Sequence, residues 1–162
     1  MLDRVRTALF DRLGNVTGSR ALDLFAGTGS LGLEALSRGA ASCVFVESSA
    51  SALAALRANV GKIGAEGRAR VVRGDAFRFV RTCGAAAFDL VFFDPPYTFL
   101  RGPRRGRTLE VLAVLRTRVL APRGRAAFHF PRDLLAPEEL TLAGPAEIRS
   151  YGSSSLAFLC AP

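Results

Sequence analysis

The chain has 162 residues, of which 49% are apolar, so its length and composition fit one globular domain rather than a disordered or fibrous protein. Its 22 basic and 14 acidic residues give a formal charge of +8, which favours a polyanionic partner such as nucleic acid. Lys62 is the single lysine and the other basic residues are arginine, in a chain also rich in Ala and Gly. A biased genome composition would produce the same excess, so the charge alone decides little.

Targeting, membrane and metal signals are missing from the sequence. No apolar run approaches the ~20 residues needed to cross a membrane, and the first residues lack the apolar core of a signal peptide. Cys43, Cys83 and Cys160 are odd in number and far apart, which fits neither a zinc site nor a disulfide framework. We therefore expect a soluble cytoplasmic protein with reduced cysteines and no metal.

The N-terminal segment has the apolar spacing of an amphipathic helix. Asp3 lies near its start, and Gly14 directly follows its end. The apolar residues that recur at helical spacing are Leu2, Val5, Leu9 and Leu13. We expect this helix to bury one face.

Short apolar runs then alternate with helical patterns. The expected strands are 21–25, 43–47, 69–75, 88–94 and 124–130. Helices are expected at 30–39, 48–61, 76–83 and about 108–119, the last after an Arg- and Gly-rich loop. This alternation predicts a parallel α/β sheet with helices on both faces. Two final runs, about 146–151 and 155–160, predict an antiparallel pair of strands on that sheet.

The first expected strand is followed by the pattern Gly-x-Gly-x-x-Gly, formed by Gly27, Gly29 and Gly32. In open α/β sheets ligands bind at the carboxyl ends of the strands, and glycines let the backbone turn tightly and approach a ligand. Glu47 follows twenty residues after Gly27, at the end of the second strand, where an acid suits the ribose hydroxyls of NAD or of another adenosine ligand. The glycines alone leave both ligand classes open.

Asp23 lies inside the first strand, where a carboxylate is costly to bury without a partner. An aminoacyl ligand with an ammonium group, such as S-adenosylmethionine, would supply that partner directly or through water. A carboxylate that accepts hydrogen bonds from the amides of the glycine loop explains the residue equally well. Both roles are compatible.

The strand end with the most specific functional signal is FDLVFFDPPYTF, residues 88–99. Asp94 follows a strongly apolar strand, Pro95 and Pro96 fix the backbone after it, and Tyr97 offers an aromatic face. A flipped or unpaired base with an exocyclic amine would donate to Asp94 and to the Pro95 carbonyl while its ring stacks on Tyr97. The alternative is an acidic turn whose prolines merely end the strand.

Several of these stretches together resemble the class I S-adenosylmethionine-dependent methyltransferases, and more narrowly the bacterial 16S rRNA guanine-N2 methyltransferase family of the guanine-966 type. The stretches are DLFAGTGSLGLEALSRGA, VFVE, GDAF and FFDPPY, with the opening helix DRVRTALFDRL and the tail RSYGSSSLAF. The resemblance covers essentially the whole chain, although D-P-P-Y is shared with adenine-N6 methyltransferases of DNA. It implies one domain over residues 1–162 with a Rossmann-like, mostly parallel seven-stranded sheet, an antiparallel C-terminal strand pair and helices on both faces.

The resemblance also implies roles for individual residues. The implied cofactor-binding residues are Asp23, Phe25, Gly27, Gly29, Glu47, Ser48, Asp75 and Ala76. Asp23 and the Gly27 to Gly29 loop would hold the methionine portion of S-adenosylmethionine, and Glu47 the ribose hydroxyls. Asp75 would accept from the adenine amine, with neighbouring contacts from Ala76 or Phe77. The implied catalytic residues, which would bind the target guanine, are Asp94, Pro95, Pro96 and Tyr97.

One feature of that family is missing ahead of Asp3. Its members usually begin with a basic, β-rich arm, so either the start of this chain is truncated or misassigned, or RNA affinity comes from elsewhere. The candidates for RNA phosphate contacts are Arg101, Arg104, Arg105 and Arg107, directly after the proposed base pocket. A solvated, mobile loop is the alternative for this segment.

The activity implied is methyl transfer from S-adenosylmethionine to the N2 of a guanine in 16S rRNA, with the small ribosomal subunit or its RNA as partner and a monomeric enzyme. Three alternatives remain: an adenine-N6 methyltransferase on DNA or RNA, a nicotinamide-dependent oxidoreductase, and an RNA-binding domain without catalysis. His129, the sole histidine, ends the fifth strand near the crevice and receives no role.

Overall fold

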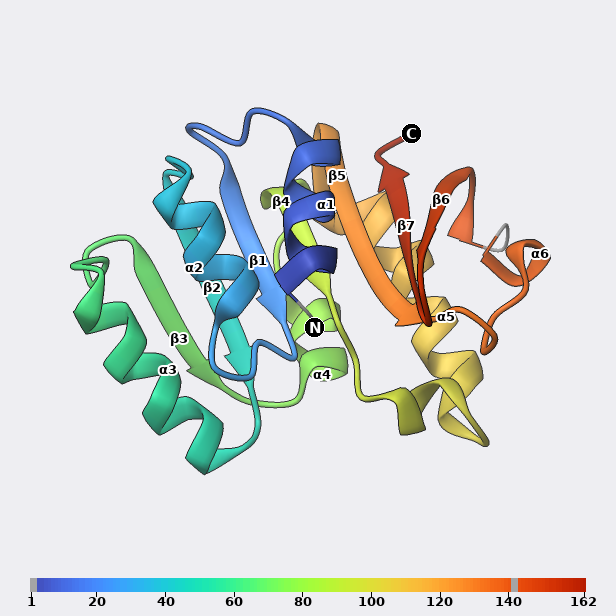
Figure 1. Ribbon diagram of the computed structural model, residues 1–162, viewed down its shortest axis with the longest axis horizontal. Helices are drawn as coiled ribbons and strands as arrows, with labels where there is room; N and C mark the ends of the chain where they lie inside the picture. Colours follow the sequence, from blue (N-terminus) through green and yellow to red (C-terminus); the bar gives the residue numbers. More distant parts are fainter. Residues whose placement is uncertain (1–2, 141–142) are drawn as a thin grey trace.

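The computed structural model describes residues 3–140 and 143–162, so Leu2 of the expected first helix lies outside the described residues. Its centre is a seven-stranded sheet with the strand order β3-β2-β1-β4-β5-β7-β6 (Figure 1). The strands are β1 Arg20–Leu24, β2 Ser42–Glu47, β3 Ala69–Arg73, β4 Phe88–Phe93, β5 Leu120–Pro131, β6 Ala146–Tyr151 and β7 Ser154–Cys160. Strands β1 to β5 are parallel, and β7 runs antiparallel to both β5 and β6. The expected sheet is confirmed.

Helices connect these strands. They are α1 Asp3–Leu13, α2 Ser30–Ser37, α3 Ala50–Lys62, α4 Ala76–Thr82, α5 Arg104–Val114 and α6 Pro137–Leu140, with a 3-10 helix η1 at Tyr97–Leu100 and a π-helix η2 at Leu115–Val119. Ser49 caps α3, because its side chain accepts a hydrogen bond from the Ala52 N–H. Within the two described ranges, no helix is both long and apolar enough to cross a membrane.

One helix differs from its expected bounds. The helix expected at about 108–119 begins at Arg104 and continues as the π-helix η2 after Val114. The Arg- and Gly-rich loop is therefore only 101–103, and Gly106 lies inside a helix despite its cost of ~1 kcal/mol relative to alanine. Tertiary contacts override that local preference: Leu109 and Leu112 are buried, and Arg105 pairs with Glu139.

The two faces of the sheet carry separate hydrophobic clusters, because successive strand residues point to opposite sides. Helices α1, α2 and α3 cover one face, and α4, α5 and η2 cover the other (Figure 1). Phe92 and Ala127 belong to the α1 side, whereas Phe93 and Phe128, which pair in register, belong to the α5 side. By the same alternation, Asp94 and His129 follow on the α1 side, at the carboxyl ends of neighbouring strands.

Candidate active site

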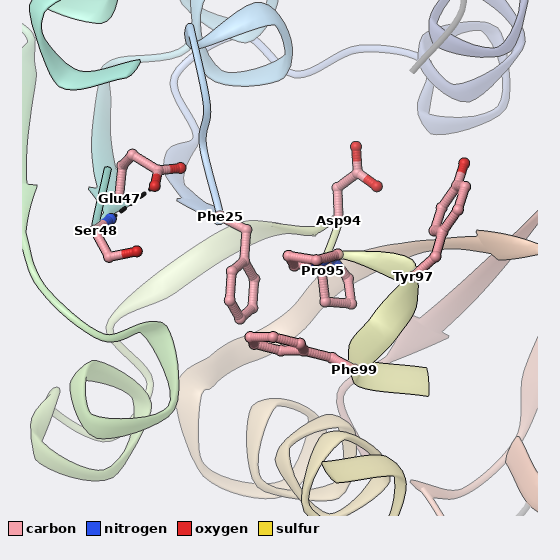
Figure 2. Close-up of a pocket in the computed structure, with 8 residues that line it drawn as sticks. Phe25, Glu47, Ser48, Asp94, Pro95, Tyr97 and Phe99 are labelled. Carbon is pink, nitrogen blue, oxygen red and sulfur yellow. Dashed lines mark hydrogen bonds between the residues drawn. The ribbon is translucent and has the colours of Figure 1, made fainter. Parts of the chain in front are cut away.

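A cavity of about 380 Å³ opens at the carboxyl ends of β1, β2 and β4 (Figure 2). Its lining residues are Phe25, Glu47, Ser48, Asp94, Pro95, Pro96, Tyr97 and Phe99. All of them except Phe99 were named from the sequence as cofactor-binding or catalytic residues. The signal for Phe99 was its place two residues after Tyr97, where a second aromatic side chain continues the same segment.

The turn between β1 and α2 has the left-handed backbone that its glycines indicated. Gly27 has φ 55° and Gly29 has φ 89°, and the non-glycine Phe25 shares this region with φ 59°. A Cβ on Gly27 would meet no atom within 4 Å, whereas one on Gly29 would overlap Leu56 of α3. A side chain at Gly29 is thus disfavoured by its positive φ and by the position of Leu56, whereas Gly27 keeps its backbone open to an approaching group.

Asp23 is buried, with 2% of its surface exposed, and its Oδ2 accepts a hydrogen bond of 2.9 Å from the Gly32 N–H. The bond comes from the third glycine of the pattern, which lies in the first turn of α2, and not from the Gly27 to Gly29 loop. Burial raises the pKa of the Asp23 carboxyl to about 8, and the nearby charges of Asp94 and Glu47 add to the rise. In the part of the chain that the structure describes, no cationic side chain lies at ion-pair distance from Asp23. An ammonium group would suit this carboxyl.

Glu47 joins the loop after β1 to the loop after β2. Its Oε2 accepts from the Gly27 N–H at 2.8 Å, and its Oε1 accepts from the N–H groups of Ser48 at 2.7 Å and Ser49 at 2.8 Å. The sequence indicated a ribose ligand at this position but not this role in holding the loops. Because a carboxylate oxygen accepts about two hydrogen bonds, Oε2 retains capacity for a hydroxyl donor.

Asp75 and Ala76 lie at the start of α4 and do not line the cavity. The Asp75 Oδ1 accepts from the Arg78 N–H at 2.8 Å and so caps the helix, while the Arg107 guanidinium lies 3.9 Å away. Ala76 is buried. Their role in binding adenine stays a prediction.

Asp94 and Tyr97 extend from the segment after β4, on the opposite side of Phe25 from Glu47 in Figure 2. Tyr97 is 47% exposed, which leaves its ring open to stacking. The Asp94 Oδ1 lies 2.8 Å from Nδ1 of His129. The sequence assigned His129 no role, although its place at the end of the strand beside β4 was visible.

The four arginines proposed for RNA contacts differ in their surroundings. Arg104 lies over the ring of Phe99 at 4.5 Å and Arg107 over the ring of Phe77 at 4.6 Å, both as cation–π pairs. Arg105 donates to both carboxylate oxygens of Glu139, so a phosphate would compete with that carboxylate. Arg101 follows η1 directly and is exposed. Their role in binding RNA stays a prediction.

Comparison with known proteins adds three similarities. Ribosomal RNA small subunit methyltransferase D of Escherichia coli is 40% identical over 114 residues, which are 70% of this chain and 54% of that protein. A solved structure from Streptococcus pyogenes, described as a conserved hypothetical protein, superposes with a TM-score of 0.81 at 29% identity, over 97% of this chain and 95% of that one. An RNA methyltransferase of Salinibacter ruber, solved in complex with S-adenosyl-L-homocysteine, gives a TM-score of 0.68 over 100% of this chain and 93% of that one. At 16% identity, the last likeness concerns the fold alone.

The chain spans about half the length of the curated relatives it matches, with aligned shares of 53% and 54% for the first two. Its fold is that of the class I methyltransferases, as the sequence predicted. The family described as Conserved hypothetical protein 95 matches residues 1–160. The chain belongs to the family Conserved hypothetical protein 95.

Proposed function

We propose that this protein transfers a methyl group from S-adenosylmethionine to small-subunit ribosomal RNA, and that the acceptor is the exocyclic N2 of a guanine. One observation carries the proposal: Asp94, a carboxylate suited to a base amine, and Glu47, a carboxylate suited to ribose hydroxyls, line one cavity. A methyl donor and an acceptor base would therefore meet in the same space. The similarity to ribosomal RNA small subunit methyltransferase D supports the RNA class of the substrate.

The residues around the glycine turn fit S-adenosylmethionine, which supplies a methyl group activated on a sulfonium. Asp23 would receive the ammonium of the methionine portion, because its buried carboxyl has a raised pKa and a cation would stabilise its charged form. Glu47 has capacity left at Oε2 for a ribose hydroxyl. The backbone of Gly27 is open to the ligand, because no atom lies within 4 Å of the place of a Cβ there.

Methyl transfer to an amine is an in-line displacement: a nitrogen–carbon bond forms as the sulfur–carbon bond breaks. Such a step needs orientation more than strong acid–base help, and positioning alone supplies several kcal/mol of the barrier. Asp94 and the Pro95 carbonyl would accept hydrogen bonds from the amine and turn its lone pair toward the methyl group. Tyr97 would stack on the base, and the surplus proton of the amine leaves to Asp94 or to water.

The test incubates the protein with methyl-labelled S-adenosylmethionine and unmodified small ribosomal subunits or their extracted RNA, followed by digestion and chromatography of the nucleosides. We expect label in N2-methylguanosine, and a drop of about 100-fold or more in kcat for Asp94→Ala. Asp89→Ala is the matched control, since Asp89 lies near the other end of the same strand and pairs with Arg20.

The outcomes separate the alternatives. Label in N6-methyladenosine would keep the mechanism and replace guanine by adenine. RNA binding and S-adenosylmethionine binding without transfer would indicate a binding domain, whereas NADH binding in place of S-adenosylmethionine would indicate an oxidoreductase. Full turnover by a folded Asp94→Ala variant would overturn the role of Asp94.

A further inference from the structure

His129 is a buried histidine beside Asp94, which lines the cavity. Its side chain is 3% exposed, and its Nδ1 lies 2.8 Å from Oδ1 of Asp94. The contact follows from the sheet: Phe93 pairs with Phe128 in register, so the next residues along β4 and β5 are Asp94 and His129. No other side-chain hydrogen bond to the Asp94 carboxylate is found among residues 3–140 and 143–162.

The second ring nitrogen of His129 defines the state of the imidazole. Nε2 is buried and has no hydrogen-bond partner among the described residues. A protonated imidazolium would bury a charged N–H without an acceptor, which costs more than burying a neutral lone pair. The favoured state is therefore a neutral imidazole whose hydrogen is on Nδ1 and is donated to the Asp94 carboxylate.

The imidazole is also held in place by its neighbours. β5 lies between β4 and β7, where His129 pairs with Leu156, and the Tyr97 ring lies 6.0 Å from the His129 ring. Two titratable groups lie beside the imidazole: the carboxylate of Asp94 after β4 and the ring of Tyr97 in η1. A ring confined in this way restricts rotation of the carboxylate it contacts.

We propose that His129 is a positioning residue: its Nδ1–H holds Oδ1 of Asp94, and this leaves Oδ2 directed to the amine of the target base. The proposal rests on the proposed function for its catalytic consequence. His129 accepts no proton in the reaction, because Nδ1 already carries one and Nε2 has no route to the amine through Asp94. The surplus proton passes to Asp94 or water, as before.

The first test needs no substrate, because it observes the imidazole directly. The chain contains a single histidine, so the signal is unambiguous. Protein labelled with ¹⁵N-histidine and produced without a polyhistidine tag gives one imidazole spectrum. We expect a protonated Nδ1 and an unprotonated Nε2 near pH 7.5, the reverse of the tautomer preferred by free histidine. A spectrum with the hydrogen on Nε2, or one averaged between the two nitrogens, would overturn the proposal.

The second test separates the effect of the hydrogen-bond donor from the effect of side-chain volume. His129→Asn places an amide N–H near the position of Nδ1 but removes volume, whereas His129→Leu keeps more volume and has no donor. We expect kcat to fall by less than about 5-fold in His129→Asn and by about 100-fold in His129→Leu, with unchanged affinity for S-adenosylmethionine in both. Equal losses, or a more active leucine variant, would show that His129 acts by packing alone. A wild-type protein that methylates no RNA would contradict the proposed function, and the tautomer would still decide the state of His129.

Discussion

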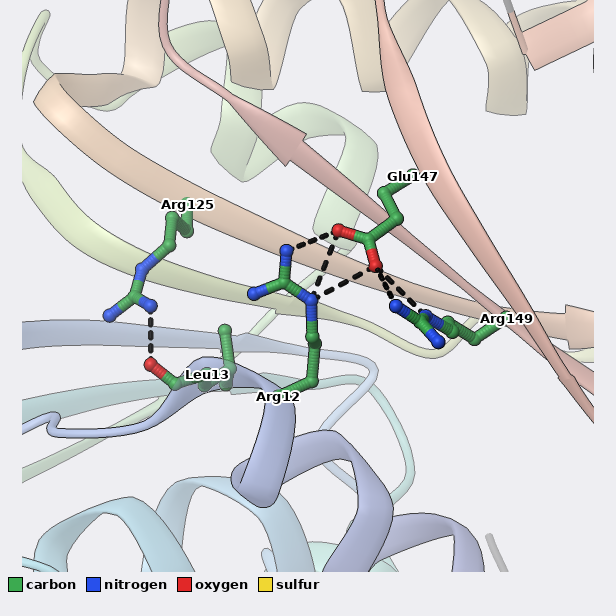
Figure 3. A network of polar contacts seen from close by, with 5 residues as sticks. All are labelled: Arg12, Leu13, Arg125, Glu147 and Arg149. Carbon is green, nitrogen blue, oxygen red and sulfur yellow. Dashed lines mark hydrogen bonds and ion pairs between the residues drawn. The ribbon is translucent and has the colours of Figure 1, made fainter.

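Acidic residues near the two ends of the parallel strands have different kinds of partner. At the amino end of β6, Arg12 and Arg149 both donate to the Glu147 carboxylate (Figure 3). The hydrogen bond from Arg12, followed by that from Arg149, lowers the pKa of Glu147 to about 2. Arg20 likewise lowers the pKa of Asp89 through a side-chain hydrogen bond. These acids are balanced by cations of the same chain.

At the carboxyl ends, the acids contact backbone N–H groups and one imidazole instead. Asp23 accepts from Gly32, Glu47 from three loop amides, and Asp94 contacts His129. Burial raises the pKa of Asp23, the opposite direction from Glu147 and Asp89. The contrast indicates that the acids at the amino ends contribute to stability, while Asp23, Glu47 and Asp94 at the carboxyl ends have no Arg or Lys ion-pair partner among the described residues, so a ligand can supply their partner.

The largest effect is expected from replacing the Asp23 carboxylate by an uncharged amide. Asp23→Asn keeps an oxygen that accepts from the Gly32 N–H but loses the partner of the ligand ammonium. A charge-assisted hydrogen bond is worth about 1.5–3 kcal/mol, so we expect S-adenosylmethionine to bind about 10- to 100-fold more weakly. Isothermal titration calorimetry measures the change. Unaltered affinity would mean that Asp23 serves the glycine turn alone.

The free energy of unfolding of the ligand-free protein should also depend on the protonation of the buried Asp23 carboxyl. Its pKa is about 8 in the folded protein and near the ordinary value of 3.8 when unfolded, so at pH 6 only the folded state binds this proton. The stabilisation that this proton gives the folded state is complete below the unfolded pKa and is lost as pH rises through the folded pKa. Between pH 6 and pH 8 the free energy of unfolding should fall by about 2 kcal/mol.

Urea unfolding at the two pH values checks this, with Asp23→Asn as the reference that lacks the titrating group. The difference between the two proteins, rather than either slope alone, isolates Asp23 from other groups that titrate. Saturating S-adenosylmethionine should flatten the dependence, because its ammonium stabilises the carboxylate. A variant that retained the full pH dependence would assign it to another residue.

Strand ends and apolar periodicity predicted the sheet and most of the cavity. Asp94 and Glu47 were found because parallel strands bring their carboxyl ends to one edge. The contact between Asp94 and His129 depends on the register of β4 with β5, which shifts between Phe88 and Leu90, and one sequence does not specify that shift. The start of α5 was missed for a similar reason, since Glu139, the partner of Arg105, is 34 residues away.

A smaller effect is expected from the ion pair of Arg20 and Asp89 at the amino ends. Its side chains are 48% and 37% exposed, so solvent screens the pair, and Asp89→Asn should cost ~1 kcal/mol or less at pH 7. The lowered pKa of Asp89 means that the cost is present above its ordinary pKa and disappears as pH falls below it. Calorimetric affinity for S-adenosylmethionine should stay unchanged, and a weakened affinity would contradict the division between the two ends.

The smallest effect is expected at Glu147, whose pairing with Arg12 and Arg149 links α1 to β6 on the exposed surface. Glu147→Gln should lower Tm slightly at pH 7, and the difference from wild type should vanish as pH falls through the folded pKa of about 2, below which the carboxyl is protonated in both states. Added salt should shrink it as well, because these charges are screened. Differential scanning calorimetry at two salt concentrations tests both dependences. A large loss of Tm that resists salt would instead mean that Glu147 holds α1 by packing, and the amino ends would then owe their stability to contacts other than charge.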